Sequence, residues 1–548
     1  MKTRRILPTL VMAAIALATG VSAAAVSFAA EGQRPRDDAM RQYLQAERPA
    51  QITRVAIDGN TIAIHGQIPP SDATRWKLVE LPPHQSSIDA DDSVEVASID
   101  TPGSFKHTVE RIADGRDRLL SRWAVISTDA TGAVLTSHAR YAEDPTAPPR
   151  QPAASKKGMA GVHSGDDLPE LLELGVKHIT VNVHLEKLIS LAPEGAIEHR
   201  YCGKTYYFAP DTIEQFDKVF GFATQNDMVA SAILLVPRLD RKTELGRLLT
   251  HPDAVDGHFS MPNVATAEGA QFFAAVIDFL AARYSRDDEA PGRITNWILG
   301  NEIDAGWIWT NSGEKTAHEY MDEYTRALRM VHAIVRSHDP HSIAFVSLTH
   351  FWAQPFDPSP LRYYAGRELL EILQRQCEVE GNFNWGVAHH PYPQDLFNSR
   401  FWEDTLAHDD FETPKITFKN VAVLDRWLHQ PRYRFNDRVR TVLLSEQGFH
   451  TPDYSAEAEQ VQAAALALSW RKVQPLESVE AYHYHRWIDH PHEGGLRLGF
   501  RRLADPNAAE LHPKKFSWNV FRALGTPDEP AATEFARPIV GDAAWKSP

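Results

Sequence analysis

The chain of 548 residues is predicted to fold as an α/β protein, a (β/α)8 TIM barrel preceded by a small all-β, sandwich-like domain. Two patterns predict these parts. Short runs of alternating apolar and polar residues crowd the first third of the chain, and strand-like and helical segments alternate through the rest. Hydrophobic residues make up 43% and charged residues 24%, as in soluble globular proteins, and the length calls for more than one core.

Residues 1–30 have the pattern of an export signal peptide. Lys2, Arg4 and Arg5 form a basic start, residues 6–18 form an apolar stretch, and small residues follow. The apolar stretch is short for a membrane span, so we expect cleavage rather than anchoring. The adjacent arginines are compatible with twin-arginine export. We therefore expect a secreted or periplasmic protein that has no stable membrane insertion after cleavage.

Residues 47–142 are predicted to form an immunoglobulin-like β-sandwich. Two alternating runs flank Asp58-Gly59-Asn60, which is typical of a β-hairpin. Seven strand-like runs within about a hundred residues indicate two stacked sheets. They are Ile52–Ile57, Thr61–Ile68, Trp76–Leu81, Ser93–Ile99, Ser104–Val109, Leu119–Ser127 and Ala133–His138. Residues 143–157 contain four prolines among small and polar residues, which is the composition of a linker.

Residues 158–548 are predicted to form the barrel. Apolar, strand-like segments joined by helices indicate a parallel sheet, and eight such units indicate a closed barrel. The strands are Gly158–His163, Ile179–Leu185, Met228–Pro237, Ile294–Ile303, Ile343–Leu348, Trp385–Ala388, Thr441–Glu446 and Val479–Trp487. The helices are Asp166–Leu174, Asp211–Thr224, Ala267–Tyr284, Ala317–Ser337, Tyr363–Val379, Phe418–Leu428, Ala456–Val473 and Phe516–Leu524. An open doubly wound sheet is the alternative, but no glycine-rich phosphate-binding turn follows the first strand.

Two glutamates stand at strand ends that a barrel would bring together. Glu302, preceded by Asn301, ends the fourth predicted strand, and Glu446 ends the seventh. Barrel enzymes take their active residues from the carboxyl ends of the strands, so both side chains would lie at one mouth. Such a pair cleaves a glycosidic bond when one carboxyl protonates the leaving oxygen and the other attacks the sugar carbon. Retention requires carboxyl groups about 5–5.5 Å apart and an acid whose pKa is raised.

The Asn301-Glu302 pair at strand four, together with Glu446 at strand seven, resembles the clan A (4/7 superfamily) glycoside hydrolases, which are retaining barrel enzymes. The resemblance covers about residues 158–525 and is loose outside these positions, where the chain is most similar to bacterial barrel proteins of unassigned function. It implies that Glu302 is the general acid/base, that Glu446 is the nucleophile and that Asn301 hydrogen-bonds the sugar 2-hydroxyl. It also implies a carbohydrate substrate, an oligo- or polysaccharide, and a mechanism that needs no cofactor or metal.

Aromatic residues after the predicted strands are candidates for stacking on sugar rings. Trp307 and Trp309 follow strand four, and Trp352 follows strand five. Trp487 ends strand eight, where the resemblance implies a platform beneath the reacting sugar. The alternative for each ring is packing between loops.

Polar residues at two further strand ends are candidates for substrate binding. His390 and Tyr392 follow strand six and lie one strand period apart, so both could face the mouth. Each could tune Glu446 through a hydrogen bond, and the alternative is packing within a loop. Clan members often carry a His or Tyr at this place. Asn182, at the end of strand two, is a further candidate for sugar contact.

Two other classes of function are compatible with a barrel. His483 and His485 form a His-x-His pair, and with His389 and Asp489 they could bind the metal of a barrel hydrolase. Metallohydrolases of this kind usually carry the pair on the first strand, where this chain has His163 alone. A non-catalytic glycan-binding barrel protein is the third reading, and it would bind sugar without hydrolysis.

Charge and cysteine content narrow the partners. The formal net charge of −15 argues against nucleic acid, which needs a basic surface to displace counterions. Cys202 and Cys377 are the two cysteines, and an exported protein could pair them or keep them free.

Overall fold

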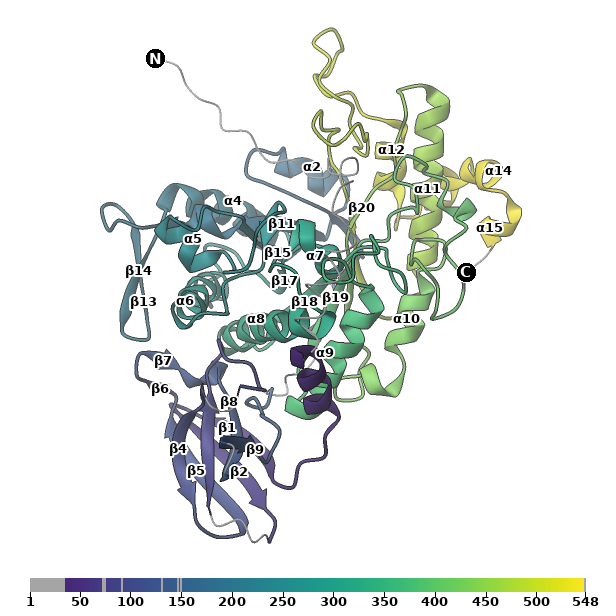
Figure 1. Ribbon diagram of the computed structural model, residues 1–548. Helices are drawn as coiled ribbons and strands as arrows, with labels where there is room; N and C mark the ends of the chain where they lie inside the picture. Colours follow the sequence, from purple (N-terminus) through teal and green to yellow (C-terminus); the bar gives the residue numbers. More distant parts are fainter. Residues whose placement is uncertain are drawn as a thin grey trace.

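The computed structural model describes residues 35–70, 75–89, 92–129, 132–144, 147 and 150–546. The predicted signal peptide at residues 1–30 lies outside these ranges. Figure 1 shows an antiparallel β part, in purple and blue, beneath a larger part in which helices surround a barrel of strands. Within the described ranges, no helix combines the length and the apolar character that a membrane span requires.

The β part is a sandwich of two antiparallel sheets. One sheet has the order β1-β2-β5 and the other β4-β3-β8-β9. Their bounds are β1 Gln51–Asp58, β2 Thr61–Ile68, β3 Trp76–Leu81, β4 Val94–Ile99, β5 Gly103–Glu110, β8 Arg122–Asp129 and β9 Gly132–Leu135. Val55 and Ile64 of the first sheet share one buried core with Trp76 and Trp123 of the second. These strands match the predicted runs, and a small hairpin, β6 (Ile112–Ala113) with β7 (Arg116–Asp117), adds to them.

The larger part is a closed parallel barrel, which confirms the predicted fold and excludes the open sheet. Among the described residues the ring runs β10, β11, β15, β17, β18, β19, β20, β21, and it closes because β10 pairs with both β11 and β21. The bounds are β10 Lys157–Met159, β11 His178–His184, β15 Val229–Pro237, β17 Asn296–Leu299, β18 Ile343–Leu348, β19 Trp385–His389, β20 Val442–Gln447 and β21 Val479–Tyr484. At the rim, β16 (Phe259–Ser260) pairs antiparallel with β15.

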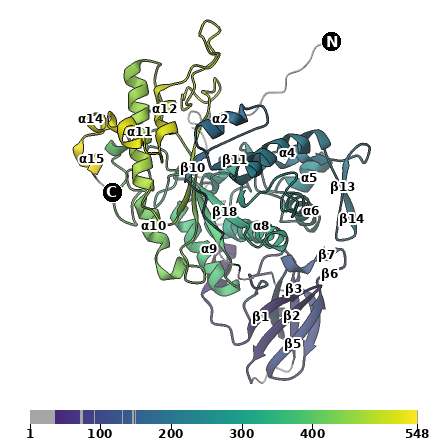
Figure 2. The same ribbon diagram turned by 180° about the vertical axis from the view of Figure 1, so that it is seen from behind.

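Helices follow the strands and cover the outside of the ring, as the two opposite views show (Figures 1 and 2). They are α2 Leu168–Glu173, α4 Pro210–Gln225, α6 Ala267–Arg283, α8 Ala317–His338, α9 Gly366–Glu380, α10 Ala422–Leu428, α11 Ala456–Val473 and α12 Phe516–Ala523. Outward side chains of the strands, such as Trp297 and Trp385, pack with these helices in the main core. Inward side chains, such as Ile298, Phe345 and Leu443, fill the barrel.

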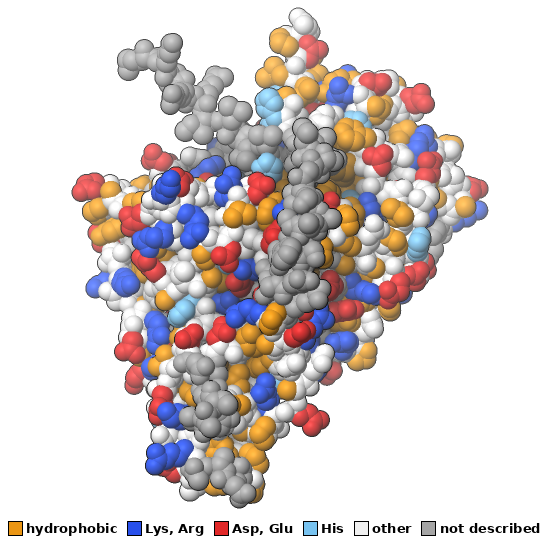
Figure 3. Space-filling model, viewed as in Figure 1, with side chains coloured by type: hydrophobic (Ala, Val, Ile, Leu, Met, Phe, Trp, Pro, Cys, Tyr) orange, Lys and Arg blue, Asp and Glu red, His pale blue; other side chains and the backbone are white. Residues whose placement is uncertain are grey.

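Shorter elements decorate the loops. At the carboxyl ends of the strands lie α3 Leu185–Leu188, β12 Ile189–Ser190, β13 Ile197–Tyr201, β14 Lys204–Phe208, α5 Glu244–Leu249 and α7 Gly306–Trp309. The chain continues beyond α12 with α13 Glu529–Thr533, α14 Ala536–Val540 and α15 Asp542–Lys546. Cys202, at the turn between β13 and β14, and Cys377, buried in α9, are both free thiols in the described chain. Over the face in Figure 3, side chains of both charges are interspersed.

Buried polar contacts fix the sandwich to α9. The carboxylate of Glu380, at the end of α9, accepts hydrogen bonds from Tyr43 (2.9 Å) and Ser87. The guanidinium of Arg122 lies 3.6 Å from the same oxygen, and Arg122 is only 1% exposed. The backbone N–H of Tyr141 donates to the Glu380 carbonyl at 3.0 Å. Because these groups are desolvated together, each depends on its partners across the junction.

Candidate active site

Glu302 and Glu446 stand at the carboxyl ends of β17 and β20, on the same rim of the barrel. Glu446 lies within β20 and is partly exposed, whereas Glu302 is 7% exposed. Glu302 has a left-handed φ of 43° and begins the 3₁₀ turn η3 (Ile303–Ala305). Its backbone N–H donates to Oγ of Ser347 on β18 at 3.0 Å. The turn before it needs glycine, because Gly300 has a φ of 72° and a Cβ there would lie 2.9 Å from Oγ1 of Thr310.

His390 connects the two strands that carry the glutamates. Its Nδ1 lies 2.9 Å from Oε1 of Glu302, and its Nε2 lies 3.1 Å from Oγ of Ser445, the residue before Glu446. Burial opposes protonation of this ring, but the hydrogen bond to Glu302 and the charges of Glu446, Glu302 and Asp304 outweigh it and raise the pKa of His390. The raised pKa favours the imidazolium, which can donate from both nitrogens, one toward the acid candidate and one toward the strand of the nucleophile candidate.

Tyr392 binds the second glutamate. Its hydroxyl donates to Oε1 of Glu446 at 3.0 Å. Burial raises the pKa of Tyr392 well above its usual range, so the phenol keeps the proton that it donates. Burial opposes ionisation of Glu446, yet the cations of His485, His390 and Arg486 and the bond from Tyr392 lower its pKa. Glu446 is thus an anion held by donors, as a carboxylate nucleophile must be.

A third carboxylate enters the mouth from the loop after β21. Glu493 is fully buried, and its Oε1 lies 2.6 Å from Nε2 of His485. Its Oε2 lies 3.6 Å from Nη1 of Arg486. The peptide bond between His485 and Arg486 is cis. Glu493 could not be predicted, because a glutamate in a long loop carries no periodicity that would place it at the mouth of the barrel.

Asp304 is a further buried acid that the sequence analysis did not single out. The backbone N–H of Thr349 donates to its Oδ1 at 2.9 Å, and the Thr349 hydroxyl binds Oδ2. Burial raises the pKa of Asp304 to about 7, with the charge of Glu302 adding to the rise against the bonds from Thr349. The sequence feature that could have pointed to Asp304 is its position two residues after Glu302.

The predicted aromatic candidates separate into two groups. The structure does not bring Trp487 or Trp352 to the glutamates, since both belong to the main core outside the ring. The indole N–H of Trp487 donates to Glu170 of α2 at 2.6 Å, and that of Trp352 donates to the carbonyl of Phe411 at 3.0 Å. Strand alternation does not continue beyond a strand's last residue, so a position counted from β21 does not fix the direction of the Trp487 ring.

The remaining candidates lie at the mouth end of the barrel. Trp307 is partly exposed on α7, with the guanidinium of Arg362 4.1 Å from its ring centre. Trp309 belongs to the cluster that fills the barrel. Asn301 is partly exposed, and its carbonyl accepts from Oγ1 of Thr310 at 3.0 Å. Asn182 is partly exposed on β11, between Val181 and Val183, which face the outer core.

The histidines of the metal alternative do not converge. Nε2 of His389 lies 3.1 Å from the carbonyl of Ile416, on the outside of β19. Nδ1 of His483 lies 3.3 Å from the carbonyl of Leu444, inside the barrel. His485 is engaged by Glu493, and Asp489 pairs with Lys515 at 2.9 Å. Burial lowers the pKa of His389 to about 3 and that of His483 to about 4, so both rings are neutral.

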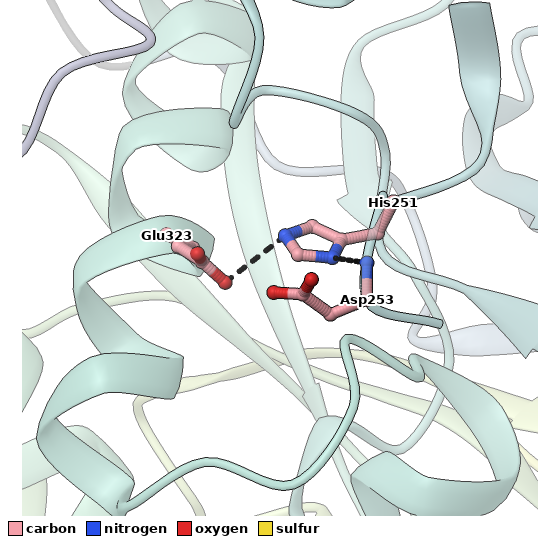
Figure 4. A group of neighbouring side chains, drawn as sticks. All are labelled: His251, Asp253 and Glu323. Atoms are coloured by element: carbon pink, nitrogen blue, oxygen red, sulfur yellow. Dashed lines mark hydrogen bonds and ion pairs between the residues drawn. The ribbon is translucent and has the colours of Figure 1, made fainter. Parts of the chain in front are cut away.

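Among the described residues, metal-type side chains do converge at His251, Asp253 and Glu323, between the loop after β15 and α8 (Figure 4). Nδ1 of His251 accepts the backbone N–H of Asp253 at 3.1 Å, so the other ring nitrogen carries the hydrogen that faces Glu323, also at 3.1 Å. The ammonium of Lys315 lies 2.9 Å from Asp253 and 3.4 Å from Glu323. Lys315 supplies the positive charge, so these groups form an ion cluster that ties the loop to α8.

A hollow of about 1210 Å³ opens at the opposite end of the barrel, where the strands begin. Arg150, Arg336 and Arg438 are among its lining residues. Its size does not mark the chemistry, because the reactive ends of barrel strands are the carboxyl ends.

The fold and the site define the class of the protein: a (β/α)8 barrel protein with two carboxylates at the ends of the fourth and seventh strands. The chain belongs to the family of unknown function DUF5722, whose model matches residues 149–548. No curated protein matches the chain.

Solved structures with a similar fold include three glycosidases. A family 39 glycoside hydrolase from the gut symbiont Bacteroides cellulosilyticus WH2 has a TM-score of 0.45 and 14% identity, covering 89% of this chain and 83% of that one. The β-glycosidase of Thermosphaera aggregans has a TM-score of 0.43 and 14% identity, covering 68% and 87%. A calcium-binding mutant of Bacteroides uniformis β-glucuronidase 2 has a TM-score of 0.38 and 10% identity, covering 88% and 51%, so this chain spans about half of it. At such values the reaction has to be inferred from the site itself.

Proposed function

We propose that the protein is a retaining glycoside hydrolase that cleaves O-glycosidic bonds of an oligo- or polysaccharide. The observation that carries the proposal is that two glutamates at one barrel mouth have different hydrogen-bond partners and different neighbouring charges. A donor and several cations lower the pKa of Glu446, whereas Glu302 shares a hydrogen bond with His390, a ring whose own pKa is raised. Two carboxyl groups in different environments are what an acid and a nucleophile require.

In the first step, the Glu446 carboxylate attacks the anomeric carbon and forms an ester bond as the bond to the leaving oxygen breaks. Glu302 gives that oxygen a proton. The Glu302–His390 pair shares one proton, which can lie on the imidazole or on the carboxyl group. In either form the pair can supply that proton to the leaving oxygen. In the second step, Glu302 takes a proton from water while the water oxygen attacks the anomeric carbon, which releases Glu446.

Asn301 and Asn182 are the proposed polar contacts to the sugar, and Trp307 is the proposed stacking residue. They are partly exposed near the mouth, where a substrate could reach them. The contacts of Trp487 and Trp352 do not favour either ring for this role.

Mechanism-based labelling tests the proposal. A panel of 2-deoxy-2-fluoro glycosides should trap one glycosyl ester on the protein, and peptide mapping should place it on Glu446. Glu446→Gln should abolish the label and turnover without changing the melting temperature. Glu302→Ala should regain activity when azide is added, because azide needs no general base. A Glu446→Gln variant that still turns over substrate would contradict the assignment.

We also propose that the protein is exported. The basic, apolar and small-residue pattern of residues 1–30 supports this. Cell fractionation with sequencing of the mature amino terminus would test it, and intact residues 1–30 on a protein retained in the cytoplasm would contradict it.

A further inference from the structure

The loop after β21 buries one of its glutamates in the barrel mouth. Glu493 is fully buried, although the loop that carries it contains exposed residues such as Glu510. Its Oε1 binds Nε2 of His485 at 2.6 Å. Its Oε2 has no hydrogen bond within the described chain and lies 3.6 Å from Arg486. A buried carboxylate is costly unless hydrogen-bond donors accompany it, so the bond with His485 is the reason that Glu493 can lie here.

His485 in turn lies beside Glu446. The two residues come from neighbouring strands, and the backbone N–H of His485 donates to the carbonyl of Gln447 at 2.7 Å. The strands approach so closely that a Cβ at Gly448 would collide with the carbonyl oxygen of His485. A positive charge on the His485 ring would favour the ionised form of Glu446, as would those on His390 and Arg486.

We propose that Glu493 is a positioning residue of this site: its bond to Nε2 fixes the imidazole of His485 beside the end of β20, where Glu446 stands, and so supports the negative charge of the nucleophile. This inference rests on the proposed function, because that function makes Glu446 the nucleophile. It adds a second support to the carboxylate. Tyr392 binds Glu446 from the segment after β19, and the His485–Glu493 pair lies directly after β21.

Several titratable groups surround this pair. His390, Tyr392 and Arg486 also act on Glu446, and His490 lies close enough to His485 and Glu493 to be affected by both. An experiment must therefore separate an effect of Glu493 that passes through His485 from a direct one. The two have opposite signs. Loss of the Glu493 charge alone would lower the pKa of Glu446, because one neighbouring anion is gone, whereas release of His485 would raise it.

The test is the titration of Glu446 in a double-mutant cycle. The protein carries ¹³C at the glutamate carboxyl carbons, and Glu446→Gln assigns the signal. Glu493→Gln and His485→Gln should each raise the pH of the Glu446 titration, by about one unit. In the His485→Gln background, Glu493→Gln should give no further rise. Equal rises in both backgrounds, or no rise from Glu493→Gln alone, would overturn the proposal.

Two further variants guard against loss of structure. Glu510→Gln makes the same chemical change in the same loop, on a 54%-exposed carboxylate that pairs with Arg501. It should leave the Glu446 titration unchanged. Glu493→Asp keeps the charge and should restore most of the wild-type value. A role in anchoring the loop alone would lower the melting temperature of Glu493→Gln without moving the titration, and that result would also overturn the proposal.

The labelling reaction separates this inference from the proposed function. If wild-type Glu446 accepts the fluoroglycoside, the acidic limb of the labelling rate should shift upward in Glu493→Gln by the same amount as the titration. If no member of the panel labels the wild type, the hydrolase proposal fails, and the titration still decides whether Glu493 acts through His485.

Discussion

The hydroxyl of Tyr392, in the segment after the sixth strand of the barrel, donates to Oε1 of Glu446 on the seventh strand at 3.0 Å. Two residues earlier in the same segment, the His390 ring holds Oε1 of Glu302 at 2.9 Å. Both residues follow β19 (Trp385–His389), and the backbone N–H of Tyr392 donates to the carbonyl of His390 at 2.9 Å, so a tight turn sets the directions of the two side chains. One short segment therefore serves both glutamates, each through its own side chain.

Tyr392→Phe should lower kcat/KM about 10- to 100-fold, because the nucleophile loses a donor that stabilises its charge. The same loss raises the pKa of Glu446, so the acidic limb of the pH profile should move upward. Tyr433→Phe is the matched control, since Tyr433 lies near the opposite end of the barrel and its ring stacks on Trp427 at 3.6 Å. An unchanged acidic limb in Tyr392→Phe would show that its hydroxyl does not tune Glu446.

His390→Asn should slow the hydrolysis of substrates with poor leaving groups more than that of substrates with activated ones, because the pair that supplies the proton is broken. We expect about a 100-fold loss of kcat/KM for alkyl glycosides and a much smaller loss for nitrophenyl glycosides. Ser445→Ala removes only the bond to Nε2 and should cost about 1 kcal/mol or less. Equal losses on both kinds of substrate would place His390 outside proton transfer.

Asp304→Asn should change how stability depends on pH. The pKa of Asp304 is raised from 3.8 to about 7 in the folded protein, so the group is protonated there while it ionises in the unfolded chain. Its contribution is complete below about pH 4 and is lost as the pH rises through 7. Asparagine cannot ionise, so the free energy of unfolding of the variant should rise relative to that of the wild type by at most about 1.4 kcal/mol per pH unit in this window. Urea unfolding of both proteins at pH 5 and pH 7.5 would measure this change. The same stability difference at both pH values would refute the prediction.

Trp487→Phe should lower stability and leave substrate binding unchanged. The ring stays buried, but the indole N–H that binds Glu170 at 2.6 Å is lost, which costs about 1–2 kcal/mol. Thermal unfolding would measure the loss, and KM should stay within the experimental scatter. A raised KM with unchanged stability would instead place Trp487 against the sugar, as its position at the end of the eighth strand suggested.

Much of the barrel could be predicted because its strands are apolar runs bounded by helices with clear periodicity. The positions of Glu302 and Glu446 follow from counting those runs, since parallel strands bring their carboxyl ends to one rim. The hairpin β6–β7 was not predicted, because strands of two residues, Ile112–Ala113 and Arg116–Asp117, show no alternation.

The parts of the site that escaped prediction depend on loops. Glu493 reaches the mouth because residues after β21 fold back over the ring, and local sequence does not encode that path. His485 was weighed only as a metal ligand, since its partner was unknown. Trp487 turns to Glu170 rather than to the mouth, and that choice depends on α2, which lies 317 positions away in sequence.

The buried bonds around Glu380 make the sandwich and the barrel one thermodynamic unit. The carboxylate of Glu380 on α9 accepts hydrogen bonds from Tyr43 and Ser87 and lies beside the guanidinium of Arg122. A barrel cut free at the linker would lose the donors to that carboxylate, and the sandwich would lose the anion beside its guanidinium. The sandwich is thus a structural subunit fused in cis. If the sandwich were exchanged between related proteins, the residues of α9 that contact it would have to be exchanged as well.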